Sequence, residues 1–143
     1  MKCYTYINEQ EEEKVLIYAK ERTKLVEDIE ALALMDDVEL TGTCNEEIIK
    51  IDIKQVSCFI SENNKVYALI KDKRYLVKYR LYQLEELNLT AFIKINQSCL
   101  ANKKEIKKFE TTIGGALKVV FKNGYMDYIS RRELKNVKQR MGI

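Results

Sequence analysis

Residues 92–109, "FIKINQSCLANKKEIKKF", decide the fold, because apolar and polar side chains alternate on both sides of a short polar run. Alternation of this kind is typical of half-buried strands, and it predicts strands at residues 92–95 and 105–109. Between them lie the polar run at residues 96–98 and the pair Lys103-Lys104. Positive charge beside hydrogen-bonding side chains suits a polyanionic ligand.

Segments of the same kind precede this stretch. Isoleucines at 49, 51 and 53 alternate with charged residues, which predicts a half-buried strand. Turn-like residues separate three further runs, and leucines at every third position follow them in "LYQLEEL". Short strands with tight connections favour an antiparallel meander. The further strands are predicted at residues 57–61, 65–70 and 75–79, and a short helix with an inward leucine face at residues 81–87.

The C-terminal part contains a hairpin and a helix. Asn123-Gly124 is the strongest short signal for a hairpin turn, here between strands at residues 117–121 and 125–129. A helix follows, since Ser130 and Glu133 have the spacing of a capping box. Its inner face is predicted to consist of Leu134, Val137 and Met141.

The first 45 residues differ from the rest. Residues 2–7 alternate and predict a strand, and residues 11–35 predict an amphipathic helix. The apolar stripe of this helix packs against its own domain or against a second subunit, and the sequence leaves both open. The chain is therefore predicted to be mainly β, with small antiparallel sheets and short helices. A strand-helix arm at residues 1–45 precedes a body at residues 46–143. The stripe consists of Val15, Tyr18, Leu25, Ile29 and Leu32.

The charge is unevenly distributed. Residues 1–47 hold 5 lysines and arginines against 13 aspartates and glutamates, whereas residues 48–143 hold 20 against 9. A basic body behind an acidic arm indicates a polyanionic partner for the body. Arg131 and Arg132 lie in the first turn of the C-terminal helix, where positive charge opposes the helix dipole. An anion would explain them, although a solvated basic surface explains one such cluster at least as well.

The composition argues against several classes of protein. The chain has no histidine, and its four cysteines include no C-x-x-C pair, so neither a zinc site nor a histidine-activated nucleophile is expected. The cysteines are expected to be reduced and mostly buried, and neither a cofactor nor an enzymatic activity is predicted. No segment has the length and hydropathy of a membrane helix or a signal peptide, so the cytoplasm is the expected location.

In their order along the chain, these features resemble the DNA-binding domain of the LytTR family of bacterial regulators. The family's pattern is an aromatic residue, a strand, a polar-polar-Ser step, an Asn before an Ile, a hairpin, and a strand that ends in Ser-Arg. The leucine helix at residues 81–87 also fits the family, and the resemblance covers residues 46–143. The matching residues are Phe92, Asn96-Gln97-Ser98, Asn102, Ile106, Asn123-Gly124 and Ser130-Arg131-Arg132.

The resemblance implies loops that enter successive major grooves of duplex DNA. Gln97 stands where members of the family commonly have a basic residue, so the resemblance leaves the preferred base at this position open. The first 45 residues are too short for a receiver domain, so phosphorylation of such a domain is not expected to control the protein. By position, the implied base contacts are Lys65, Gln97 and Arg132. The implied phosphate contacts are Asn64, Asn96, Ser98, Asn102, Lys103, Lys104 and Arg131.

The predicted function is that of a cytoplasmic, sequence-specific regulator of transcription that binds double-stranded promoter DNA at repeated sites. The arm at residues 1–45 would form a homodimer or receive a regulatory protein. The alternative is a basic interaction module that binds an acidic protein or an anionic membrane surface, without insertion into the membrane. The salt dependence of DNA affinity separates these hypotheses, because phosphate contacts make it steep.

Overall fold

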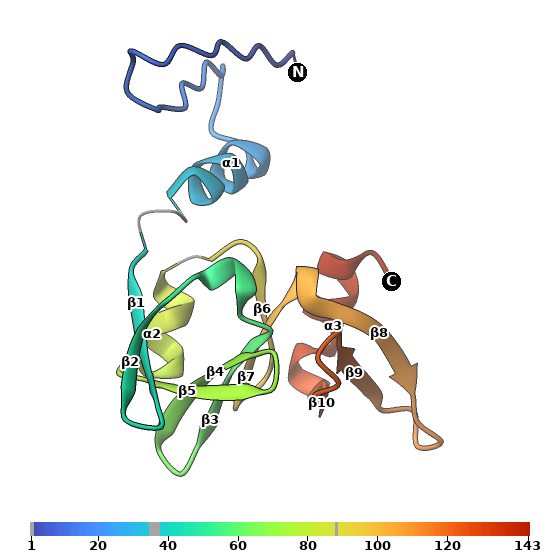
Figure 1. Ribbon diagram of the computed structural model, residues 1–143. Helices are drawn as coiled ribbons and strands as arrows, with labels where there is room; N and C mark the ends of the chain where they lie inside the picture. The colour runs from blue at the N-terminus through green and yellow to red at the C-terminus, as the bar shows by residue number, and fades with distance from the viewer. Residues whose placement is uncertain (1, 35–37, 88) are drawn as a thin grey trace.

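The computed structural model describes residues 2–34, 38–87 and 89–143 of the chain. Within these residues, ten strands form two antiparallel sheets, so the predicted mainly-β architecture with short helices is confirmed. The larger sheet has the strand order β2-β1-β5-β4-β3-β7-β6 (Figure 1). Its strands are β1 (Leu40–Cys44), β2 (Glu47–Ile51), β3 (Cys58–Glu62), β4 (Lys65–Ile70), β5 (Lys73–Val77), β6 (Phe92–Asn96) and β7 (Cys99–Asn102).

The smaller sheet has the strand order β10-β9-β8. None of the helices in the described part of the chain is long and apolar enough to cross a membrane. The strands of this sheet are β8 (Ile106–Thr111), β9 (Leu117–Phe121) and β10 (Met126–Tyr128). The helices are α1 (Lys24–Leu34), α2 (Leu81–Glu86) and α3 (Arg131–Met141), with short 3-10 turns η2 (Ile53–Gln55) and η3 (Lys103–Glu105).

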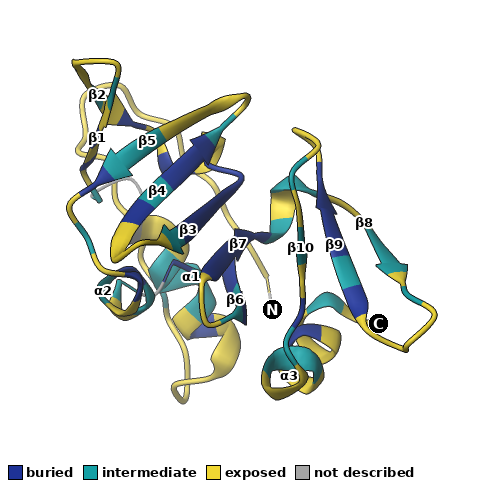
Figure 2. Ribbon diagram, turned by 90° about the horizontal axis from the view of Figure 1, so that it is seen from below, coloured by how far each residue is buried: buried dark blue, intermediate teal, exposed yellow. Residues whose placement is uncertain are grey.

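Two hydrophobic cores lie on opposite faces of the larger sheet, because β3 and β7 are apolar on both faces. Phe59 and Leu100 belong to the first core, which α2 and the β1–β2 hairpin also line. Their neighbours Cys58 and Cys99 belong to the second core, which the smaller sheet and α3 also line. Buried residues accordingly run along β4, β7 and β9 (Figure 2). This double burial accounts for the continuous apolar runs in the sequence of these strands.

The inner faces predicted for two helices are confirmed. Each helix is held by one apolar stripe, as expected of helices whose stability comes from tertiary packing. α3 packs along β6 (Figure 1). The stripe of α2 consists of Leu81, Leu84 and Leu87 in the first core, and that of α3 of Leu134, Val137 and Met141 in the second.

The prediction for the N-terminal arm is wrong in two respects. Residues 2–7 form no strand, and their side chains are exposed. The helix begins at Lys24 instead of residue 11. Thr23 precedes it, and the Thr23 Oγ1 accepts a hydrogen bond from the Val26 N–H at 3.3 Å. A threonine side chain that accepts from the first turn is a helix start signal, so α1 begins where its N-cap lies.

Most of the predicted stripe is exposed, both in α1, where Leu25 and Leu32 are 51% and 49% exposed, and in the segment before it. Val15 and Tyr18 are 58% and 93% exposed, so neither covers apolar surface of the body. A short helix without such packing is marginal in water, which leaves this segment without regular structure. The predicted end of the helix at residue 35 lies outside the described residues.

The boundary predicted after residue 45 falls inside a hairpin of the body. β1 lies between β2 and β5 in the larger sheet, and Thr43 of β1 is opposite Leu76 of β5. The body therefore begins no later than Leu40, and removal of residues 1–45 would also remove an inner strand.

Two local predictions also differ from the structure. Ser130 is the N-cap of α3, but its side chain makes no capping hydrogen bond, and the Glu133 N–H donates to the Ser130 carbonyl oxygen at 3.1 Å. The capping box is therefore absent. Ile53 is not in a strand, because the Asp52 Oδ1 accepts from the Lys54 N–H at 3.0 Å and starts η2.

Candidate nucleic-acid interface

Three loops from separate parts of the chain meet at one edge of the molecule. We name this surface the loop edge, and it consists of residues 63–65, 96–98 and 130–132. The tip of the β3–β4 hairpin and the start of α3 lie at the same side of the molecule, at the opposite end from α1 (Figure 1). The structure thus brings together the three segments that carry the predicted base contacts.

Backbone hydrogen bonds hold these loops together. The Ser61 N–H, near the end of β3, donates to the Ser98 carbonyl oxygen at 2.8 Å. The Ser130 N–H, at the start of α3, donates to the Ile95 carbonyl oxygen at 2.9 Å. Because each bond joins residues far apart in the sequence, the arrangement of the loops depends on the folded sheet.

The β3–β4 turn presents Lys65. Asn63 and Asn64 have positive φ angles of 51° and 61°, which a type I′ hairpin turn requires and asparagine tolerates well. Lys65 opens β4 and is exposed. By strand alternation its side chain lies on the same face as Tyr67, which packs against the second core. Lys65 therefore projects from the loop edge on the α3 side of the sheet.

Asn96 organises the β6–β7 turn. Its Oδ1 accepts a hydrogen bond from the Ser98 N–H at 2.8 Å, and its Nδ2 donates to the Tyr128 carbonyl oxygen at 2.8 Å. The amide of Asn96 is thus engaged within the protein, whereas the side chains of Gln97 and Ser98 are exposed. These contacts support a positioning role for Asn96 better than the predicted phosphate contact.

The start of α3 carries an excess of positive charge. Arg131 and Arg132 are exposed, and neither has an ion-pair partner in the described part of the chain. The helix dipole disfavours a cation at this end, and Glu133 is the acidic residue of the first turn against these two arginines. Two arginines held in this way favour an anion from outside the protein.

Three of the predicted phosphate contacts lie away from the loop edge. Asn102 is 1% exposed, donates from Nδ2 to the Val56 carbonyl oxygen at 2.9 Å, and accepts at Oδ1 from the Lys104 N–H. Its burial does not support a phosphate contact. The Lys103 N–H donates to the Ala91 carbonyl oxygen at 2.7 Å, at the start of β6. The length of β6 therefore separates Lys103 and Lys104 from the loop edge, about 15 Å at 3.3 Å per residue.

The neighbours of Lys103 confirm this location. Arg140, at the C-terminal end of α3, donates to the Thr90 and Phe92 carbonyl oxygens at 3.4 and 3.3 Å. Burial first, and Arg140 second, lower the pKa of Lys103, while Asp28 of α1 raises it. Lys103 thus lies among α1, η3 and the end of α3, at the opposite end of β7 from Gln97.

Residues 46–142 match the LytTr DNA-binding domain family. The chain belongs to the LytTR family. It is 31% identical to proteins named "Uncharacterized HTH-type transcriptional regulator" from Staphylococcus aureus strains MSSA476 and NCTC 8325. These matches span 148 residues, with 100% of this chain and 99% of each relative. The LytTR protein is therefore similar to these regulators along its whole length.

The fold of this LytTR protein also matches a solved structure. A LytTr DNA-binding domain from Bacillus cereus superimposes with a TM-score of 0.68 at 19% sequence identity. The match covers 73% of this chain and 97% of the other. Within the described residues of the LytTR protein, strands separate each helix from the next, so the loop edge is not a helix-turn-helix unit.

Beside the loop edge of this LytTR protein lies a residue that no sequence motif indicated. Arg80 precedes α2, and its Nη1 donates to the Asn64 carbonyl oxygen at 3.5 Å. The sequence gives only a basic residue before a leucine-rich helix. Its position beside the β3–β4 turn arises from the packing of α2 on the sheet.

The cysteines of the LytTR protein are free, but they do not share one environment. Cys58 and Cys99 are fully buried in the second core, Cys44 is half-buried and Cys3 is exposed. A hydrogen bond with Cys58, followed by burial, raises the pKa of the Cys99 thiol well above its ordinary value. Cys99 follows the β6–β7 turn directly, yet it is protonated and enclosed. Packing is therefore the role that the structure supports for the buried pair.

Proposed function

We propose that this DNA-binding transcriptional regulator reads the major groove of its promoter with the loop edge. The observation that carries the proposal is the convergence of three chain-distant loops on one edge with cations that lack partners in the described structure. Lys65, Gln97 and Arg132 contact base edges. Arginine and lysine donate to guanine O6 and N7, and glutamine bonds adenine through two hydrogen bonds.

The predicted phosphate contacts fall into two groups according to where they lie in the structure. Asn64, Ser98 and Arg131 lie on the loop edge and meet the DNA backbone, where their role is to fix the register of the protein. Asn96 holds the turn that presents Gln97. Lys103 and Lys104 lie at the other end of β7, so they contribute attraction without direct contact.

The N-terminal arm serves assembly or regulation in this proposal. Its apolar side chains are exposed, which supports contact with a second copy of the chain or with a regulatory protein. A dimer would bind repeated sites in the promoter, and the protein would act in the cytoplasm. The exposed large apolar residues of the arm are Tyr4, Tyr6, Ile7, Val15, Leu16, Tyr18, Leu25 and Leu32.

Selection of bound duplexes from a random pool tests the function. We expect enrichment of one short motif, repeated at a fixed spacing, and a steep fall in affinity with salt. Membership of a DNA-binding family does not favour the alternative of a basic module for acidic proteins or membranes. If no motif were enriched and anionic vesicles bound the protein instead, the proposal would be wrong.

A further inference from the structure

We propose that the groove between α2 and the β6–β7 turn binds a phosphate of the DNA backbone, with Arg80 as its principal donor. This inference rests on the proposed function, since it adds a backbone contact beside the base contact of Gln97. The groove is open to solvent and has a volume of about 510 Å³. Its lining residues are Ser61, Arg80, Leu81, Tyr82, Glu85, Lys94 and Gln97.

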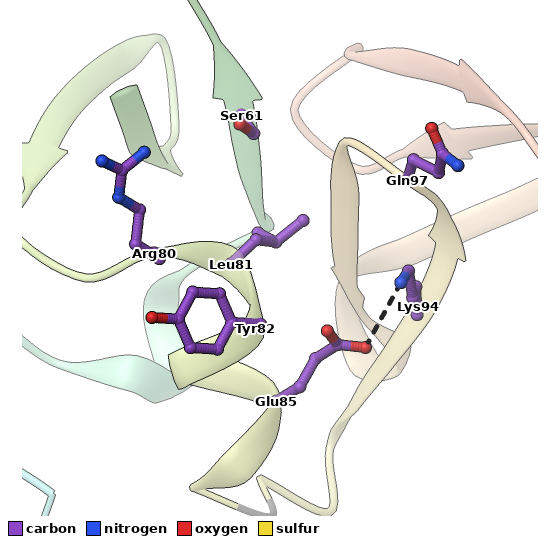
Figure 3. Close-up of a pocket in the computed structure, with 7 residues that line it drawn as sticks. All are labelled: Ser61, Arg80, Leu81, Tyr82, Glu85, Lys94 and Gln97. Carbon is purple, nitrogen blue, oxygen red and sulfur yellow. Dashed lines mark ion pairs between the residues drawn. The ribbon is translucent and has the colours of Figure 1, made fainter. Parts of the chain in front are cut away.

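The two ends of the groove differ in charge. Glu85 is the carboxylate of the lining, and it pairs with the Lys94 Nζ at 3.8 Å (Figure 3). Arg80 lies away from this ion pair, on the other side of Leu81 and Tyr82, whereas Gln97 lies on the same side as Lys94. Arg80 has no ion-pair partner in the part of the chain that the structure describes. A phosphate at the Arg80 end would thus meet a guanidinium that no described carboxylate pairs with.

The donors that line the groove come from three elements. Arg80 supplies the guanidinium from the residue before α2, Ser61 supplies a hydroxyl from β3, and Gln97 supplies an amide from the β6–β7 turn. Guanidinium, hydroxyl and amide groups are the side chains that most often contact phosphate oxygens. The chemical class of the ligand is therefore a phosphate ester.

The Arg80 side chain is held at the loop edge. Its Nη1 donates to the Asn64 carbonyl oxygen at 3.5 Å, and the Arg80 backbone N–H donates to the Gln83 Oε1 at 2.8 Å. α2 itself is fixed by the buried Leu81 and Leu84. A guanidinium has five N–H donors, so a single contact with Asn64 leaves donors for a ligand.

Arg80 and Lys65 lie on opposite faces of the same sheet edge. Lys65 projects on the face of the second core, together with the start of α3, whereas Arg80 and α2 lie on the face of the first core. A loop edge that enters a major groove has a phosphate backbone on each side. Arg131 contacts the backbone on the α3 side. Arg80, in the groove beside α2, contacts the backbone on the opposite side.

The test compares Arg80→Ala with Lys78→Ala, which removes an exposed cation two residues away that does not line the groove. Affinity for the selected duplex and for random duplex is measured across salt concentrations. We expect Arg80→Ala to weaken both duplexes alike and to reduce the salt slope by about one unit, and Lys78→Ala to change the slope by much less. Thermal unfolding confirms that both variants are folded.

Duplexes with single neutral methylphosphonates locate the contact. At one backbone position, the neutral linkage should weaken the wild type and leave Arg80→Ala unaffected. If Arg80→Ala kept the wild-type salt slope while Arg132→Ala lost preference at one base, the groove assignment would fail and the proposed function would stand. If neither wild type nor variants preferred the selected duplex, the proposed function itself would fail.

Inorganic phosphate distinguishes a DNA phosphate from a free anion. The side-chain resonances of Arg80 and Gln97 are followed by NMR during a titration with phosphate, at constant ionic strength. Saturable shifts of these resonances, together with unchanged duplex binding by Arg80→Ala, would assign the groove to a free anion and overturn the inference. Loss of duplex affinity on Arg80→Ala, without saturable binding of inorganic phosphate, is the result we expect.

Discussion

Arg132 and Arg131 are adjacent, exposed and equal in charge, yet they have different proposed tasks. Arg132→Ala should weaken binding to the selected duplex by roughly 1–3 kcal/mol and relax preference at one base, as loss of a bidentate base contact does. Arg131→Ala is the matched control, because a phosphate contact affects all duplexes alike. If each variant lost the same affinity for selected and for random DNA, Arg132 would contact only phosphate. Thermal midpoints should barely change, since both side chains are exposed.

Substitutions of Asn96 test whether its side chain positions the β6–β7 turn or contacts a phosphate. Asn96→Ala removes two hydrogen bonds that hold the β6–β7 turn, so we expect a loss of about 1–2 kcal/mol in the free energy of unfolding, measured with urea. Asn96→Asp is the control, because it keeps the acceptor for the Ser98 N–H. A variant with wild-type stability and weakened DNA binding would instead support the direct phosphate contact.

The buried thiols give a prediction about reactivity and pH. Cys3 should react quickly with a thiol reagent in the native protein, whereas Cys58 and Cys99 should react only after unfolding. The pKa of Cys99 is raised in the folded state, so its contribution to stability is complete below the ordinary thiol pKa and is lost as pH rises through the folded value. Loss of DNA binding on mild oxidation, reversed by a reducing thiol, would contradict this account.

At the scale of elements, α3 links the second core to the loop edge. Val137 is fully buried at its centre, and Val137→Ala removes two methyl groups and leaves a cavity. We expect a loss of roughly 2–3 kcal/mol in the free energy of unfolding. Val15→Ala, in the exposed arm, removes the same groups and should change stability by less than about 0.5 kcal/mol. Similar effects of the two substitutions would mean that α3 is not held by this stripe.

At the scale of the whole molecule, the arm and the body can be separated by two deletions. Deletion of residues 1–21 removes the exposed apolar residues before α1 but keeps the Thr23 cap, α1 and the body, so the thermal midpoint should be unchanged while the mass in solution falls from dimer to monomer. Deletion of residues 1–45 also removes β1, which lies between β2 and β5, and should lower the midpoint strongly. Light scattering and calorimetry measure both. If the mass stayed unchanged after the shorter deletion, the arm would not form a dimer, and its role would be to bind a regulatory protein.

The sequence by itself determined the features that arise between near neighbours. Alternation specified the strands of the body, because side chains two residues apart lie on one face of a strand. The stripe of Leu134, Val137 and Met141 specified the buried face of α3, because side chains three and four residues apart lie on one face of a helix. The order of these elements and of the polar run was enough to identify the LytTR resemblance.

Only the tertiary structure decided which polar residues remain available to a ligand. Asn96 and Asn102 resemble exposed loop residues in the sequence, but their amides bond to carbonyl oxygens of Tyr128 and Val56, 32 and 46 residues away. The position of Arg80 beside Asn64 likewise depends on surfaces built by distant segments. Local patterns set where a strand or helix forms, whereas hydrogen-bond partners and burial are properties of the folded whole.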